Sequence, residues 1–298
     1  MPPATESRLL QLGPEGAAVR DEPAGPASGR LRGSVLLPVL DADGPWLRVL
    51  TPCERPRWLE AACGRPVSAA VALDPGHGGD EPGAVGPGGR VERDLNLDVA
   101  LRAAVLLRQA GVAAVTTRTG DYRATLGFRT AVAGSMGAAA LVSVHHNAEP
   151  DGRSSRPGTE TYHQHADPAS RRLAGLLYEE LVAALAAAAP DRTSWPANAD
   201  AGAKWRLNDA GLDYYGVLRR PAAEGVTACL TEFAFLSDPG DEALLERPEV
   251  RAAEAGALAR AVVRFLRTHD AGSGWTEPVH RIRPAGPGGG LEGCLDPS

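Results

Sequence analysis

The pattern of hydrophobic and polar positions along this chain changes at about residue 68. From there to residue 269, short apolar runs typical of buried β-strands alternate with longer stretches in which apolar residues recur at helical spacing. The predicted strands are residues 69–73, 112–117, 141–144 and 226–231, and the predicted helices are residues 95–110, 126–136, 168–188 and 250–267. This alternation predicts an α/β domain over residues 68–269, with a mostly parallel, twisted sheet flanked by helices.

The chain before residue 68 has a different pattern. Apolar runs of β type at residues 34–40 and 46–50 lie on either side of a turn-rich segment, and they predict a small β appendage over residues 31–66. The stretch DGPWLRVLTP within it resembles part of a bacterial SH3-type module, and a two-stranded addition to the edge of the main domain explains it equally well. Residues 1–30 and 270–298 are rich in Pro and Gly, so we expect a disordered leader and a disordered tail without chemistry.

Composition and charge exclude several classes of function. The formal charge is −6, from 31 basic and 37 acidic residues, and no run of Lys or Arg is present to follow a phosphate backbone. Nucleic acid is therefore not an expected partner. The longest apolar tracts, such as residues 181–189, are shorter than the ~20 residues needed to cross a bilayer, so no transmembrane segment is expected. Residues 1–30 also lack the basic start and the apolar stretch of a secretory signal.

The four cysteines form no CxxC pair and are poor candidates for zinc ligands. Cys229 lies in an apolar run where a small buried residue fits. Cys53 and Cys63 are a candidate disulfide if the protein is exported, and two free thiols are the alternative.

A glycine-rich turn follows the first predicted strand of the main domain. The sequence DPGHGG at residues 74–79 places His77 just beyond the end of the strand, where open α/β sheets bind their ligands. His77 is therefore a candidate metal ligand. A phosphate-binding loop is a weaker interpretation, because the GK[ST] ending is missing, and a purely structural turn histidine is the other alternative.

Three further polar clusters lie at element ends. Glu92 precedes the first long helix, where on its own it could simply complement the helix dipole. In SVHHN at residues 143–147, side-chain alternation sends the two histidines to opposite faces, so His145 joins the site with Asn147, and His146 is expected to be structural. Glu232 follows a buried strand, a costly place for a carboxylate unless it is paired or used.

Together these residues predict a zinc hydrolase. Two histidines and one glutamate form the His₂Glu set that binds catalytic zinc and leaves a fourth position open for water. Glu232 then remains as the base that takes a proton from the attacking water. The competing mechanisms lack their motifs, since the chain has no GxSxG turn, no cysteine near a histidine in sequence and no HExxH helix.

Six stretches in order resemble the zinc-dependent N-acetylmuramoyl-L-alanine amidases of the Amidase_3 class. They are LDPGHGG with EPGA (73–84), ERDLNL (92–97), TRT with Arg129 (117–129), SVHHN (143–147), GTE (158–160) and TEFAFLS (231–237). The resemblance covers about residues 69 to 268 and implies that His77, Glu92 and His145 bind Zn²⁺ and that Glu232 is catalytic. It also implies the bond that is cut, between the lactyl group of N-acetylmuramic acid and L-alanine in peptidoglycan. Phe233, Ala234 and Asp238 depart from the usual pattern and leave substrate detail open.

Further expectations concern the substrate. Asn147, Arg129, Trp205 and Tyr214 are candidate peptidoglycan-binding residues, the last two because they lie in an aromatic-rich stretch at residues 191–215. Packing of these rings onto the domain is the alternative, and the composition of the stretch does not suggest a blocking helix. The inferred substrate implies action at the cell wall or outside the cell, and a monomer is expected. The alternatives are a non-catalytic peptidoglycan-binding or regulatory protein and a zinc enzyme acting on another amide.

Overall fold

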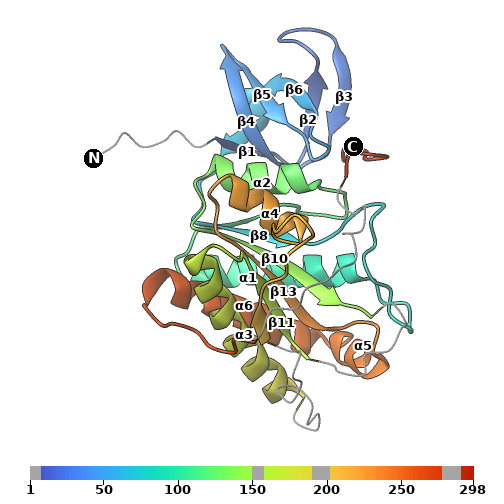
Figure 1. Ribbon diagram of the computed structural model, residues 1–298. Helices are drawn as coiled ribbons and strands as arrows, with labels where there is room; N and C mark the ends of the chain where they lie inside the picture. The colour runs from blue at the N-terminus through green and yellow to red at the C-terminus, as the bar shows by residue number, and fades with distance from the viewer. Residues whose placement is uncertain (1–7, 150–157, 190–201, 277–289) are drawn as a thin grey trace.

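Two sheets organise the chain in the computed structural model, which describes residues 8–149, 158–189, 202–276 and 290–298. A seven-stranded sheet is built by the first 66 residues, and a six-stranded sheet with its helices is built by the rest (Figure 1). No helix in these ranges is both long and apolar enough to span a membrane.

The N-terminal sheet is antiparallel in all its described pairs, in the order β3-β2-β6-β5-β4-β1-β7. Its strands are β1 (Leu9–Leu12), β2 (Ala17–Arg20), β3 (Ala27–Leu31), β4 (Leu36–Asp43), β5 (Trp46–Leu50), β6 (Pro56–Glu60) and β7 (Gly64–Pro66), with a 3₁₀ turn at Ala61–Cys63. Alternate side chains, among them Leu10, Val19 and Val49, pack into one buried cluster. The prediction of a disordered leader is therefore wrong for residues 8–30. The Gly and Pro residues there form turns between very short strands, and Gly16 has the positive φ of 68° that such a turn requires.

The six-stranded sheet has the order β12-β11-β13-β10-β8-β9. Its strands are β8 (Val71–Pro75), β9 (Ala114–Thr116), β10 (Ala140–Asn147), β11 (Glu160–His163), β12 (Gly202–Lys204) and β13 (Ala228–Phe235). Within this sheet only the β11–β13 pair among the described strands is antiparallel. The mixed α/β fold is confirmed, but "mostly parallel" does not describe the whole chain, because the N-terminal sheet is antiparallel.

Helices cover both faces of this sheet (Figure 1). They are α1 (Glu92–Gln109), α2 (Leu126–Ser135), α3 (Pro168–Ala188), α4 (Gly216–Ala223), α5 (Pro239–Leu245) and α6 (Pro248–Arg267). Successive residues of a strand point to opposite faces. Val142 of β10 accordingly packs with α1, α3 and α6, and Leu141 packs with α2 and α4. The four predicted helices are present within three residues of their expected ends, whereas α4, α5, β11 and β12 were not predicted.

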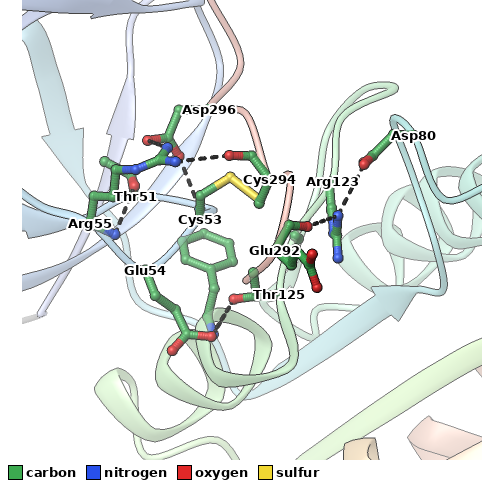
Figure 2. The surroundings of a disulfide bond; sticks show 12 residues. Thr51, Cys53, Glu54, Arg55, Asp80, Arg123, Thr125, Glu292, Cys294 and Asp296 are labelled. Atoms are coloured by element: carbon green, nitrogen blue, oxygen red, sulfur yellow. Dashed lines mark hydrogen bonds and ion pairs between the residues drawn. A yellow bond between two sulfur atoms is a disulfide. The ribbon is translucent and has the colours of Figure 1, made fainter. Parts of the chain in front are cut away.

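The C-terminal segment 290–298 is fastened to the N-terminal sheet (Figure 2). A disulfide joins Cys53 to Cys294 with a Cα–Cα distance of 5.7 Å, and Arg55 donates to the Asp296 carboxylate at 3.0 Å and to the Cys294 carbonyl at 2.8 Å. The candidate Cys53–Cys63 pairing is therefore wrong, and the alternative of free thiols holds for Cys63 but not for Cys53. The disordered-tail prediction is wrong for these residues, while 277–289 lie outside the described ranges. Sequence spacing does not determine which cysteines pair. Native disulfides typically stabilise a fold by about 2–4 kcal/mol.

Candidate metal centre

The turn after β8 brings His77 over the edge of the sheet. His77 itself has a positive φ of 60°, and Gly78 and Gly79 follow with φ of 130° and 62°. Such a conformation is rare for a residue with a side chain and is concentrated at functional sites. Gly76 is needed for another reason, because a Cβ atom there would lie 2.1 Å from the ring of His145. The glycines therefore permit both the turn and the close approach of the two histidines.

His77, Glu92 and His145 form one compact group. Glu92 is the first residue of α1, and its buried carboxylate lies between the two imidazoles. His77 Nε2 is 3.2 Å from Glu92 Oε2, and His145 Nδ1 is 2.9 Å from Glu92 Oε1. One donor atom from each of the three side chains lies within 4.8 Å of the others. The donor set is the His₂Glu combination used by catalytic zinc sites, so the residues present fit this metal.

The electrostatics of the group suit a cation. Burial raises the pKa of Glu92, but the His77 charge and the hydrogen bonds from both histidines outweigh it, so the net pKa is well below the usual 4.5. Burial lowers the pKa of His145 by more than its Glu92 partner raises it. At neutral pH the glutamate is thus an anion and His145 a neutral imidazole, which are the forms that bind a metal.

Glu232 lies on β13 beside this group. It is in register with His145 on the parallel neighbour β10 and with Glu160 on the antiparallel neighbour β11. Residues in register on adjacent strands project from the same face of a sheet. The half-buried Glu232 side chain therefore shares the face of His145, at the sheet edge where the His77 turn also lies.

Most of the chain matches the sequence model of a known protein family. The family model for N-acetylmuramoyl-L-alanine amidases, the Amidase_3 class, matches residues 71–264. This chain belongs to that amidase family. The match covers the six-stranded sheet and its helices and begins after the N-terminal sheet.

Individual members of the amidase family resemble the chain over about two thirds of its length. The AmiC amidase of Neisseria meningitidis is 30% identical over 236 residues, which cover 68% of this chain and 53% of that protein. A crystal structure of an amidase from Clostridium difficile superposes with a TM-score of 0.56 at 26% identity, covering 68% of this chain and 99% of the other. AmiC2 of Nostoc punctiforme gives a TM-score of 0.54 at 28% identity, with coverages of 67% and 99%. The chain spans about half the length of the first curated relatives, 55% of the uncharacterised Bacillus subtilis protein YqiI and 53% of AmiC.

Beside Glu232, a buried charged cluster is centred on Glu160. Its carboxylate accepts hydrogen bonds from Lys204 Nζ at 2.7 Å, from Asn147 Nδ2 at 2.9 Å and from the Tyr162 hydroxyl at 2.5 Å. Arg206 lies nearby, 3.9 Å from Glu160. Sequence analysis found Asn147 but assigned no role to Glu160, Lys204 or Arg206. Glu160 was noted only as part of the GTE stretch of the family resemblance, and Lys204 and Arg206 lie in a segment too short to show a periodic pattern.

The two aromatic candidates lie in different surroundings. Trp205 is half-buried, with its ring 6.3 Å from that of His165, and Tyr214 packs against Tyr215 at 5.2 Å between ring centroids. It is Tyr215, together with His77 and His145, that lines a cavity of about 170 Å³. The structure thus places a third aromatic residue, rather than the two predicted ones, directly beside the metal group, while residues 190–201 lie outside the described ranges.

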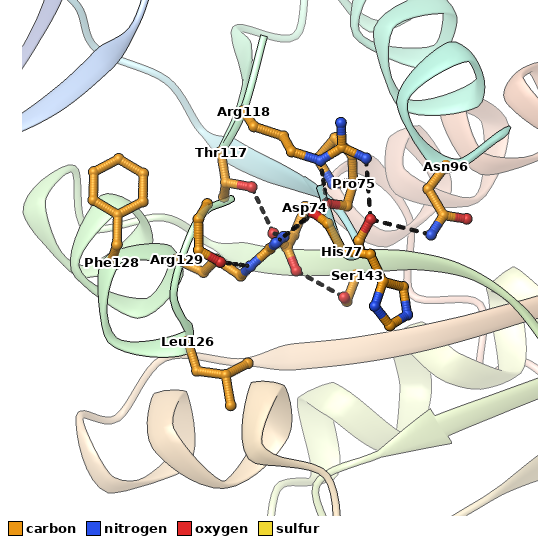
Figure 3. Close-up of polar contacts among 12 residues, drawn as sticks. Asp74, Pro75, His77, Asn96, Thr117, Arg118, Leu126, Phe128, Arg129 and Ser143 are labelled. Atoms are coloured by element: carbon orange, nitrogen blue, oxygen red, sulfur yellow. Dashed lines mark hydrogen bonds and ion pairs between the residues drawn. The ribbon is translucent and has the colours of Figure 1, made fainter. Parts of the chain in front are cut away.

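Arg129 supports the His77 turn through hydrogen bonds to its backbone (Figure 3). Its guanidinium pairs with the Asp74 carboxylate and donates to the carbonyl oxygens of Pro75 at 2.7 Å and His77 at 2.8 Å. Ser143 also donates to Asp74, at 2.8 Å. Arg129 was predicted to bind substrate. It does line the cavity, but its side chain is only 4% exposed and its polar atoms are engaged by the chain.

Proposed function

We propose that this chain is a zinc-dependent amidase that hydrolyses the bond between the lactyl group of N-acetylmuramic acid and L-alanine in bacterial peptidoglycan. The observation that carries the proposal is the convergence of His77, Glu92 and His145 within 4.8 Å at the sheet edge that Glu232 shares. Membership of the amidase family supports the choice of substrate.

The residues have distinct tasks in this reaction. His77, Glu92 and His145 hold the zinc, which when bound polarises the amide carbonyl and lowers the pKa of a water ligand toward about 7. Glu232 accepts the proton that the attacking water loses and donates it to the nitrogen of L-alanine as the C–N bond breaks. Burial lowers the pKa of Arg206, but the nearby tyrosines Tyr215 and Tyr162, Glu160 and Glu232 raise it overall. Arg206 therefore places a positive charge near Glu232.

The proposed place of action is the cell wall. The Cys53–Cys294 disulfide supports this, because disulfides persist in oxidising compartments outside the cytoplasm. Action as a monomer remains a prediction.

The test is to incubate the purified protein with peptidoglycan, with and without a chelator, and to identify released products by mass. We expect stem peptides that begin with L-alanine, lost on chelation and restored by zinc. Glu232→Gln should lower the rate by about 10²–10⁴-fold, the usual contribution of a general base, while zinc stays bound at one per chain. The matched control is Glu179→Gln on α3, whose side chain pairs with Arg264. Full activity of Glu232→Gln would exclude the base assignment, and wall binding without peptide release would favour a binding protein.

A further inference from the structure

A buried ionisable pair lies behind the metal centre, on the opposite face of β10. His146 Nε2 is 3.6 Å from Glu254 Oε2 on α6, and both side chains are fully buried. The His146 ring stacks on Phe233 with ring centroids 5.3 Å apart. Within the described residues, neither carboxylate oxygen of Glu254 nor His146 Nε2 has a hydrogen-bond partner. Well-packed apolar residues are usually as stable as, or more stable than, such a pair, so packing alone does not account for it.

The other nitrogen of His146 points to Asn96, which links the pair to Glu92. His146 Nδ1 is 2.8 Å from Asn96 Oδ1. Asn96 Nδ2 donates to Glu92 Oε1 and to the Gly76 carbonyl, both at 3.2 Å, and Figure 3 shows Asn96 pointing from α1 toward the end of β8. Because both of these neighbours are acceptors, the amide nitrogen must face them, and its oxygen must face His146. Nδ1 of His146 therefore carries the proton of that hydrogen bond.

The orientation of Asn96 matters for Glu92. Glu92 Oε1 also accepts from the His146 backbone N–H at 3.2 Å and pairs with His145 Nδ1. A flipped amide would place the Asn96 oxygen against this carboxylate, so a repulsive contact would replace one of its donors. The His146 ring prevents the flip as long as its N–H faces Asn96. Two neighbours set the direction of the His146 ring: Glu254 faces Nε2, and the Phe233 ring stacks on the imidazole. Glu254 thus acts on Glu92 through two intermediate side chains.

We propose that His146 and Glu254 are positioning residues for the metal centre: they hold Asn96 so that its N–H group fixes the Glu92 carboxylate for the metal. The proposal rests on the proposed function, in which Glu92 is a zinc ligand. Partners that orient a metal ligand typically contribute about 10–100-fold to metal affinity. The pair is therefore a determinant of zinc affinity that does not itself touch the metal.

The test compares zinc affinity with stability. The double variant His146→Phe/Glu254→Leu replaces the pair with apolar side chains, and this gain offsets the loss of the donor to Asn96 Oδ1, so the variant should still fold. We expect its zinc dissociation constant, measured by chelator competition, to rise about 10–100-fold. Asn96→Ala should weaken zinc to a similar extent, and the triple variant should be no weaker than Asn96→Ala alone, because the pair acts through Asn96. Leu258→Met, one turn along the buried face of α6, is the matched control and should leave zinc affinity unchanged.

The outcomes separate this proposal from the proposed function. Zinc binding that is unchanged in His77→Ala would contradict the metal site itself. Normal zinc affinity in a folded double variant, or fully additive losses in the triple variant, would instead overturn the positioning role alone. If the double variant does not fold, Glu254→Gln removes the charge facing Nε2 at nearly constant volume. A folded Glu254→Gln protein with unchanged zinc affinity would also overturn the proposal.

Discussion

Two polar clusters at the end of β8 differ in how their charges are satisfied. In the first, Asp74 and Arg129 have side chains only 1% and 4% exposed, and both oxygens of Asp74 accept hydrogen bonds from the chain. In the second, His77 and His145 are 31% and 16% exposed, and their donor atoms converge with those of Glu92. A closed, fully paired cluster is suited to holding a loop in place. An open cluster of convergent lone pairs is suited to binding a ligand.

The closed cluster explains how the open one keeps its shape. Arg129 donates to the carbonyl oxygens of Pro75 and His77, and Arg118 donates to those of Pro75 and Gly76 at 3.0 Å each. These carbonyls belong to the turn whose left-handed backbone presents His77. On the outer side, Arg123 pairs with Asp80 at 3.0 Å and donates to the carbonyls of Gly290 and Glu292 in the C-terminal segment (Figure 2). Arg118 and Arg129 therefore hold the backbone of the turn, and Arg123 links the adjacent Asp80 to the C-terminal segment.

The largest expected effect comes from breaking the open cluster. His77→Ala removes one of three zinc ligands, and we expect peptide release to fall by at least about 10³-fold, since a catalytic zinc site needs its full ligand set. The zinc-free protein should lose less stability than it does when a closed-cluster partner is removed, because the His77 side chain is 31% exposed and Glu92 keeps its His145 partner. Urea unfolding in the presence of a chelator, together with metal analysis, measures both quantities. A strongly destabilised zinc-free variant would show that His77 is structural and would remove the contrast between the clusters.

Breaking the closed cluster should have its main effect on the free energy of unfolding. Asp74→Asn leaves the Arg129 charge buried without its counter-ion, and loss of one partner of a buried pair typically costs about 3–5 kcal/mol. Urea unfolding of the zinc-free protein measures this loss. The control is Arg260→Gln, which removes an exposed partner of Glu180 and should cost less than about 1 kcal/mol. Equal stabilities for the two variants would mean that the buried network does not hold the turn.

Sequence patterns found the long elements and the residues at their ends. Helix α3 has the predicted bounds Pro168–Ala188, because its apolar periodicity is long and Asp167 caps it at Pro168. His77, Glu92 and His145 were identified because each is a polar residue at the end of a strand or the start of a helix. A glycine-rich turn, a buried strand and the start of a helix are local features, so each can be recognised from a short stretch of sequence.

Contacts between distant residues could not be predicted in this way. The three-residue strand β12 is too short to give a periodic signal, yet it carries Lys204 into a buried ion pair with Glu160, 44 residues earlier. Helix α4 was missed because it is short and contains Pro221, a residue that usually breaks helices. Strands β4 and β5 match the β-type runs predicted at residues 34–40 and 46–50, but strands β1 to β3 and the Cys53–Cys294 bond were missed. Their Gly- and Pro-rich sequences resemble disorder until long-range pairing is known.

The smallest expected effect is a change with pH in the stability difference between wild type and Asp74→Asn, which reports on the closed cluster alone. Burial raises the pKa of Asp74, but the Arg129 charge and hydrogen bonds from Thr117, Arg129 and Ser143 outweigh it, so the pKa lies below the usual 3.8. Because the folded pKa is lowered, this stabilisation is fully present above about pH 3.8 and is lost as the pH falls through the folded value. The stability difference between wild type and Asp74→Asn should thus be constant at higher pH and shrink below pH 3.8, by at most about 1.4 kcal/mol per pH unit. Glu92 also has a lowered pKa, but it is present in both proteins and cancels in the difference. Urea unfolding of the zinc-free pair from pH 6 down to about pH 3 makes the measurement. A difference that stays constant over that range would show that Asp74 does not titrate with the Arg129 pair, and the electrostatic account of the closed cluster would have to be replaced by one based on packing.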